Sequence, residues 1–311
     1  MAKVALVETK PSKTNFKQEF DHAFEFDQYQ LCSDPTLKKV LKRDCDIDIN
    51  TDDYDWVILV GSDALKYFTK INSVMEYSGK KVEGKFLPVI NPAMLAFKPE
   101  VRRTWEDSKE SITKYIRGEI EDVVIDESIA FGIQDTGEAN AFIRKALEHP
   151  GDYIALDSET TGLYPRDGYM LGISLCYDGK SGAYIDTECF DCETESLLRE
   201  LFLKKNVIFH NAKFDMAFFE YHFNFKFPRF EDTMLLHYLI DENPGTHGLK
   251  QLAIKYTQYG DYEKPMYDWI DQYRKEHGVL KNEFQWSAIP FDVMKTYAAI
   301  DALATFLLYE K

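Results

Sequence analysis

Two acidic residues, Asp157 and Glu159, follow directly after the apolar run 153–156. If that run is a strand, residues two apart point to the same face of a sheet, so both carboxylates can approach one metal ion. The spacing alone is a weak signal, because Asp-x-Glu pairs also occur at 186/188, 191/193 and 261/263. A solvated strand end is the ordinary interpretation of any one such pair.

Two further acids, Asp215 and Asp301, belong to other predicted elements, and folding could bring them close to Asp157 and Glu159. Asp215 follows the apolar run 207–209 and falls in the first turn of an expected helix, where an acid also has a plain capping role. Asp301 lies four residues after Tyr297 in a helical pattern, and this spacing stacks the two side chains on one face. Only the four acids together indicate a site.

A group of carboxylates can hold divalent cations, and phosphodiester hydrolysis is one reaction that such cations serve. It places negative charge on the attacking oxygen, the phosphate and the leaving oxygen, and two divalent ions roughly 3.5–4 Å apart can stabilise both oxygens of an in-line displacement. Carboxylate oxygens suit Mg²⁺ or Mn²⁺. Without a cation the carboxylates raise each other's pKa, so we expect them to be partly protonated or poorly arranged in the metal-free protein.

The residues around these acids have the pattern of an α/β domain. Strands followed by helices are typical of layered α+β or α/β domains. We place this domain at residues 137–311, after a linker at 119–136 that begins with an acidic stretch poor in helix signals. The expected strands are 153–156, 170–177, 182–185 and 206–209, and the expected helices are 138–147, 195–204, 216–223, 233–240, 249–256 and 291–309.

The order of the acidic motifs, DxE, NxxxD and YxxxD, resembles that of one exonuclease family. Residues 152–309 resemble the 3′–5′ exonuclease domain of family A DNA polymerases, in the DEDDy branch of the DnaQ-like superfamily, which implies an RNase H-like fold. The matching stretches are IALDSETTGL (154–163), VIFHNAKFDM (207–216), FEDTMLLHYLID (230–241), THGLKQLA (246–253) and PFDVMKTYAAIDALAT (290–305).

The resemblance implies a role for each residue of the acidic set. Asp157 would bridge two divalent cations, Mg²⁺ or Mn²⁺. Glu159 and Asp301 would complete the site of the ion that activates water, and Asp215 would hold the second ion, largely through water. The Tyr297 hydroxyl would orient the attacking water, because a phenol with a reference pKa of about 10 is a poor general base at pH 7.

The resemblance also implies contacts with the substrate strand. Thr160 and Leu163 follow the first acidic pair, and Leu163 would wedge against the terminal bases. Asn211 would touch the sugar-phosphate, and Lys250 would lie near the backbone of the strand. Each has a plainer explanation: a turn residue, a core leucine, a helix cap and a solvated lysine.

Residues 1–118 are expected to form a separate small α/β domain. Apolar runs at 3–7, 55–61 and 86–90 predict strands, and a helix is expected at 103–116, ended by Gly118. This half resembles the uracil-DNA glycosylase fold, a three-layer α/β domain. Active glycosylases carry a His-Pro-Ser type loop where this chain has NPA, so the resemblance implies a catalytically inactive domain. The stretches that carry it are VGSDAL (60–65), SGKK (78–81) and VINPA (89–93).

The composition limits the binding partners. The chain has 311 residues and a formal net charge of −16, from 37 Lys and Arg against 53 Asp and Glu. Such an acidic protein is a poor candidate for broad duplex binding, which depends on Lys and Arg neutralising phosphates.

No apolar run approaches the roughly 18 residues of a membrane span, and no secretory leader is expected. Five cysteines with a single CxxC, at 189–192, indicate reduced thiols in a cytoplasm rather than a zinc site.

The pairing of the two domains resembles the N-terminal region of large bacteriophage family A DNA polymerases. The resemblance implies a metal-dependent 3′–5′ exonuclease that removes nucleoside monophosphates from single-stranded DNA 3′ ends. It would proofread for a polymerase domain or subunit, in the cytoplasm of a bacterial host. Because ten residues follow Asp301, we expect no polymerase active site here, in a fragment or in a separate subunit. Two alternatives stay open: an RNase D-like exoribonuclease, and a non-catalytic docking subunit of a polymerase.

Overall fold

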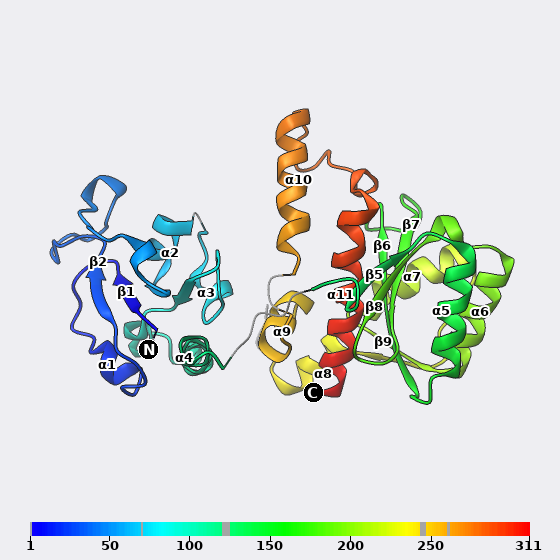
Figure 1. Cartoon of the computed structure of the whole chain (residues 1–311), viewed down its shortest axis with the longest axis horizontal. Coiled ribbons are helices and arrows are strands. Elements are labelled where there is room, and N and C mark those ends of the chain that lie inside the picture. The colour runs from blue at the N-terminus through cyan, green and yellow to red at the C-terminus, as the bar shows by residue number, and fades with distance from the viewer. Residues whose placement is uncertain (1, 70, 120–124, 243–246, 260–261) are drawn as a thin grey trace. The chain divides into compact units, whose positions relative to one another are not determined.

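The computed structural model of the chain describes residues 2–69, 71–119, 125–242, 247–259 and 262–311. The chain divides into two compact units, Met1–Asp122 and Val123–Lys311. Each unit has its own sheet and its own apolar interior (Figure 1). An α/β fold, predicted for both halves, is confirmed.

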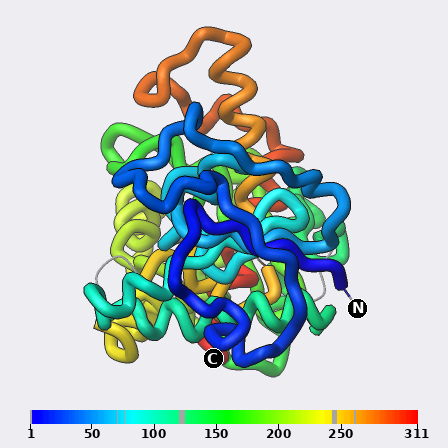
Figure 2. Tube along the Cα trace, turned by 90° about the vertical axis from the view of Figure 1, so that its left-hand side faces the viewer, coloured from blue at the N-terminus to red at the C-terminus, as the bar shows by residue number. Residues whose placement is uncertain are grey.

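The first unit is built on a parallel sheet in the order β2-β1-β3-β4. Strands such as β3 are apolar along almost their whole length, as expected for parallel strands buried on both faces. Gly118 ends α4 in the left-handed conformation, at φ 69°. The elements, drawn blue to teal in Figures 1 and 2, are β1 (Val4–Glu8), α1 (Phe16–Glu19), β2 (Asp27–Gln30), β3 (Trp56–Val60), α2 (Ser62–Thr69), α3 (Val74–Tyr77), β4 (Phe86–Val89) and α4 (Arg102–Arg117). The glycosylase resemblance and the three-layer arrangement stay predictions.

The second unit contains a six-stranded mixed sheet in the order β10-β9-β6-β7-β8-β5. Strand β6 lies near its middle, parallel to β9 on one side and antiparallel to β7 on the other. The pairing with β9 stops at Ala155, so the end of β6, with its acidic residues, extends past β9 and pairs with β7 alone. The bounds are β5 (Ala130–Ile133), β6 (Tyr153–Thr160), β7 (Met170–Cys176), β8 (Gly182–Asp186), β9 (Asn206–Phe209) and β10 (Phe230–Asp232).

Strand β5 lies inside the range 119–136 that the sequence analysis assigns to a linker. Residues Ala130–Ile133 pair in parallel with Gly182–Ile185 of β8, and both Ala130 and Ile133 are buried. These four residues therefore belong to the second sheet and not to a linker. A four-residue edge strand is too short to give a periodic hydrophobic signal, so the pattern could not indicate it.

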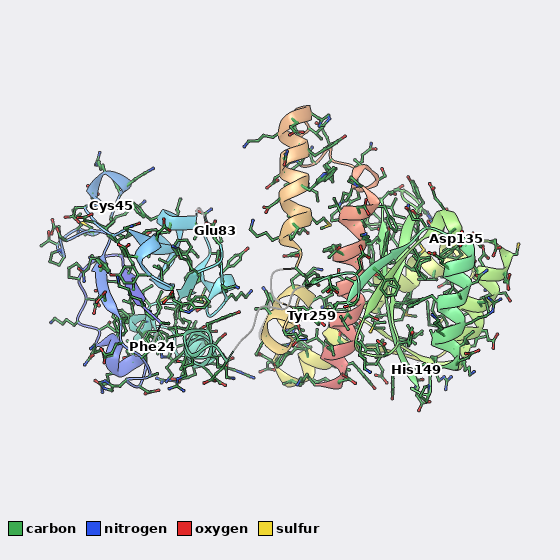
Figure 3. The ribbon with its side chains drawn as sticks, viewed as in Figure 1. Phe24, Cys45, Glu83, Asp135, His149 and Tyr259 are labelled. Carbon is green, nitrogen blue, oxygen red and sulfur yellow. The ribbon has the colours of Figure 1, made fainter. Side chains whose placement is uncertain are left out.

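Helices cover both faces of the second sheet. Helices α5, α6 and α7 contribute buried side chains to one core, and α9, α10 and α11 to a second core. Figure 1 shows α5 and α6 on one side of the sheet and α11 on the other. Asp135 and His149, labelled in Figure 3, mark the two ends of α5, where the Asp135 carboxylate accepts from the Glu138 N–H. The bounds are α5 (Thr136–Glu148), α6 (Cys192–Lys204), α7 (Ala212–Phe223), α8 (Thr233–Ile240), α9 (Leu249–Tyr256), α10 (Lys264–His277) and α11 (Phe291–Glu310).

Helix α11 crosses the sheet at very close range, and Gly182 makes this approach possible. A Cβ atom added at Gly182 would lie 1.9 Å from the backbone carbonyl oxygen of Ala299. We expect Gly182→Ala to lower the free energy of unfolding by about 3 kcal/mol, since neither backbone can move without disturbing the core. Urea unfolding followed by circular dichroism measures this loss.

The matched control for that substitution is Gly162→Ala, whose added Cβ would meet its nearest neighbour, the carbonyl oxygen of Asp167, at an ordinary 3.8 Å. Equal unfolding free energies for the two variants would contradict the close packing of α11 on β8.

The described ranges contain no helix that is both long and apolar enough to cross a membrane.

Candidate active site

Three carboxylates from two elements meet where β6 ends. Asp157 and Glu159 extend from β6 and Asp301 from α11, and one ligand atom of each lies within 4.8 Å of those of the other two. Glu159 is 7% exposed and Asp301 4%, while Asp157 is partly exposed. Within the described part of the chain, no other three Asp, Glu, His or Cys side chains are close enough to hold one metal ion.

The pairing of β6 with β7 fixes the direction of the first two acids. Asp157 lies opposite Ser174 and Glu159 opposite Gly172, and the register shifts only after Glu159. Both carboxylates therefore point to the face of the sheet that α11 covers. Gly172 has no side chain on that face, and the ring of Tyr184 occupies the space, 2.3 Å from where a Cβ would stand. The small residue and the ring together form the wall beside Glu159.

The fourth acid, Asp215, is held from the other face of the sheet. It lies in the first turn of α7 and is 2% exposed. Its Oδ1 atom accepts hydrogen bonds from the Ser158 N–H at 2.9 Å and from the Ser158 hydroxyl at 2.6 Å. Ser158 stands between Asp157 and Glu159 in sequence, so its side chain points to the opposite face, towards α7. Asp215 is thus hydrogen-bonded to β6, but it is not one of the three carboxylates that converge within 4.8 Å.

The pKa values of Asp157, Glu159 and Asp215 are all raised, and burial is the largest cause in each case. Burial raises the pKa of Asp157 well above its usual range, and the charges of Asp215, Asp301 and Glu159 raise it further. Burial, and after it the charge of Asp301, raises the pKa of Glu159 to about 8. Burial raises the pKa of Asp215 to about 7, against the hydrogen bonds from Ser158, which lower it. Because a divalent cation would balance this charge, the donor set fits a hard metal ion.

We expect Ser158→Ala to lower the free energy of unfolding at pH 8 by about 1–3 kcal/mol, because a buried carboxylate loses one of its two donors. Urea unfolding at pH 8 measures this. Ser174→Ala is the matched control, since the buried Ser174 hydroxyl has no hydrogen-bond partner among the described atoms. If the two variants lost equal stability, the Ser158 hydroxyl would not support Asp215.

Tyr297 lies one turn before Asp301 on α11 and is 9% exposed. Burial raises the pKa of its hydroxyl well above the usual range, and the charges of Asp301 and Glu159 raise it further. The phenol therefore stays protonated at neutral pH. It can donate or accept a hydrogen bond, but it cannot act as a base.

Lys250 and Tyr262 complete the surroundings of Asp301. The Lys250 ammonium forms an ion pair with Asp301 Oδ1, and the Tyr262 hydroxyl donates to the same oxygen. The strand contact expected of Lys250 stays a prediction, and in the structure its ammonium pairs with Asp301, one of the three carboxylates. Tyr262 was not predicted at all. It stands in no motif, and no spacing rule connects it with Asp301, 39 residues further along the chain.

The remaining predicted residues lie around this centre. Thr160 donates its hydroxyl to the Gly162 carbonyl at 2.8 Å, which shapes the turn after β6. Leu163 in that turn is 76% exposed, so it is not a core leucine. Asn211 precedes α7 in the left-handed conformation at φ 71° and makes no side-chain capping hydrogen bond. Its N–H donates to Asp232 at 3.0 Å. The core explanation of Leu163 therefore does not hold, while Asn211 does occupy the N-cap position of α7, and the contacts of both with a substrate stay predictions.

The sequence model of the 3′–5′ exonuclease domain of family A DNA polymerases matches residues 131–311, more than half of the chain. The chain belongs to this exonuclease family. The 3′–5′ exonuclease function implied by the resemblance is thereby confirmed for the second unit, the exonuclease unit.

The chain is also similar to a part of longer DNA polymerases. It is 36% identical to the DNA polymerase of Escherichia phage T5, over 99% of this chain and 38% of that protein. It is 27% identical to the DNA polymerase of Bacillus phage SP01, over 85% of this chain and 32% of that protein. Among solved structures, RNase D of Escherichia coli, an exoribonuclease, is 17% identical with a TM-score of 0.43, over 58% of this chain and 43% of that one. The chain thus spans less than two-fifths of the length of these two polymerases.

Proposed function

We propose that the exonuclease unit uses two divalent cations, Mg²⁺ or Mn²⁺, to remove nucleoside monophosphates from single-stranded DNA 3′ ends. In this proposal it proofreads for a family A DNA polymerase domain or subunit in the cytoplasm of a bacterial host. The observation that carries the proposal is the convergence of Asp157, Glu159 and Asp301 within 4.8 Å, in a chain of this exonuclease family.

The acidic side chains and Tyr297 would have different roles in catalysis. Asp157, Glu159 and Asp301 would hold the ions, with Asp215 close by and fixed in place by Ser158. When bound, divalent ions lower the pKa of water and stabilise the charge on the attacking and leaving oxygens. Tyr297, protonated at neutral pH, would orient the attacking water rather than deprotonate it. The buried surroundings of Glu159 and Asp301 exclude bulk water, which strengthens these electrostatic interactions.

The residues around the turn after β6 would contact the strand. Leu163 projects its side chain into solvent, as a residue that packs against terminal bases must. Thr160 and Asn211 would reach the sugar-phosphate. A net charge of −16 predicts weak, salt-sensitive binding of DNA by this chain alone, because few positive charges offset its own repulsion of phosphate. A polymerase that supplies basic surface would offset this weakness.

The main competing candidate is an exoribonuclease, because the four acids by themselves do not distinguish deoxyribose from ribose. The names of the two phage relatives favour DNA. The test compares degradation rates of single-stranded DNA and RNA oligonucleotides of identical sequence under the same metal concentration. Faster degradation of DNA is expected, and faster degradation of RNA would replace the proposal with the exoribonuclease. Degradation of neither would favour a non-catalytic docking subunit.

A further inference from the structure

Lys250 brings a positive charge against Asp301, one of the three converging carboxylates. Besides its ion pair with Asp301, its Nζ atom lies 3.0 Å from the Tyr262 hydroxyl oxygen. The same nitrogen lies over two aromatic rings, 4.1 Å from the centroid of Tyr297 and 4.7 Å from that of Tyr262. The ammonium is therefore enclosed by one carboxylate, one hydroxyl and two ring faces, all of which attract a cation.

The carboxylates need such a charge when no metal ion balances them. The Asp301 side chain is 6% exposed and that of Lys250 26%, so water screens the pair only partly. Among the ion pairs between described residues, this is the one that includes a member of the group Asp157, Glu159 and Asp301. Lys250 thus supplies the compensating charge that a divalent ion would otherwise provide.

The position of Lys250 also allows the ammonium to leave. Lys250 is the second residue of α9, and its four-carbon side chain is flexible, so the nitrogen can move several ångströms without a change in the helix. A divalent ion and an ammonium that share the Asp301 carboxylate would repel each other strongly in this largely buried place. Movement of Lys250 relieves this repulsion at little structural cost.

We infer that Lys250 is the internal counter-ion of the catalytic carboxylates: its ammonium, held by Tyr262, takes a cation position in the metal-free protein and leaves Asp301 when a divalent ion binds. Lys250 therefore competes with the metal and sets its affinity. The displaced ammonium becomes available for the strand contact that the sequence predicts. This inference rests on the proposed metal-dependent function.

The first test measures Mn²⁺ binding to the full chain by isothermal titration calorimetry, without nucleic acid. Lys250→Met keeps an apolar side chain of similar length and removes the charge, so we expect Mn²⁺ to bind about tenfold more tightly or better. Lys255→Met, an exposed lysine on the same helix, is the matched control and should leave the affinity unchanged. Equal or weaker binding by Lys250→Met would overturn the inference, whereas no Mn²⁺ binding by the wild type would overturn the proposed function instead.

The second test needs no variant and detects the displacement itself. The wild-type chain is treated with an amine-acetylating reagent with and without Mn²⁺, and mass spectrometry follows acetylation of Lys250 against that of Lys255. We expect Mn²⁺ to speed acetylation of Lys250 severalfold while Lys255 reacts at a constant rate. An unchanged or slower rate at Lys250 would show that the ammonium stays on Asp301, and would overturn the inference even if the Lys250→Met chain did not fold.

Discussion

Asp301→Asn is expected to lower the rate of nucleotide release at least about 10³-fold while the chain stays folded. The substitution keeps the shape of the side chain and removes one negative charge from the group that would hold the catalytic ions. A loss of about 4 kcal/mol of transition-state stabilisation, within the several kcal/mol attributed to metal ions in such reactions, corresponds to a factor of about 10³. The measurement is single-turnover degradation of a labelled single-stranded oligonucleotide at saturating Mg²⁺.

The control for Asp301→Asn lies on the same helix. Asp292 is in the first turn of α11, with its side chain 85% exposed, and pairs with Lys295. Asp292→Asn removes the same charge from α11 without touching the carboxylate group, and should retain nearly full activity. Similar losses in both variants would mean that the charge of the helix, not the position of Asp301, matters for the rate.

The second large effect is a loss of stability of the metal-free protein as pH rises. The pKa values of Glu159 and Asp215 are raised to about 8 and about 7 in the folded chain, against about 4 in the unfolded chain. Between these limits the folded state binds more protons than the unfolded state, so the free energy of unfolding falls with pH. The stability contributed by protonated Glu159 and Asp215 is fully present below about pH 4, and it is lost by about pH 8 as both groups ionise in the folded chain. We expect a fall of a few kcal/mol between pH 5 and pH 8.5 without metal.

Metal ions should reverse this trend, because they bind the deprotonated carboxylates. The increase in melting temperature caused by millimolar Mg²⁺ should therefore be larger at pH 8 than at pH 6. Glu159→Gln, which mimics the protonated acid, should be more stable than the wild type at pH 8 in EDTA and should gain less from Mg²⁺. Thermal unfolding at several pH values, with and without Mg²⁺, measures both effects. A wild-type stability in EDTA that rises from pH 5 to pH 8.5 would contradict the raised pKa values.

Strand periodicity predicted that Asp157 and Glu159 share a face, but only the order of the acidic motifs, and the resemblance it carries, placed Asp301 in the same site. The order of the motifs then identified the exonuclease family. The helix end at Gly118 followed in the same way from a residue that tolerates positive φ. For the shared strand face and the helix end, a local rule applied over a few residues was sufficient.

Contacts between distant segments were beyond such rules. The hydrogen bonds from Ser158 to Asp215 join residues 57 positions apart and depend on how α7 meets the sheet. The hydrogen bond from Tyr262 to Asp301 joins the residues before α10 to α11, and so depends on how these two parts of the chain pack. For Lys250 the sequence offered two interpretations, a contact with the strand backbone and a solvated lysine, and its ion pair with Asp301, 51 residues away, was not predicted.

The most direct test of the central claim follows a single-stranded DNA oligonucleotide, labelled at its 5′ end, in the presence of Mg²⁺ or Mn²⁺. The wild-type chain should produce a ladder of products that shorten from the 3′ end. EDTA and the double variant Asp157→Ala/Glu159→Ala should both abolish the ladder. A ladder of equal intensity from the double variant, or intact oligonucleotide with the wild type in both metals, would contradict a metal-dependent 3′–5′ exonuclease site at these carboxylates.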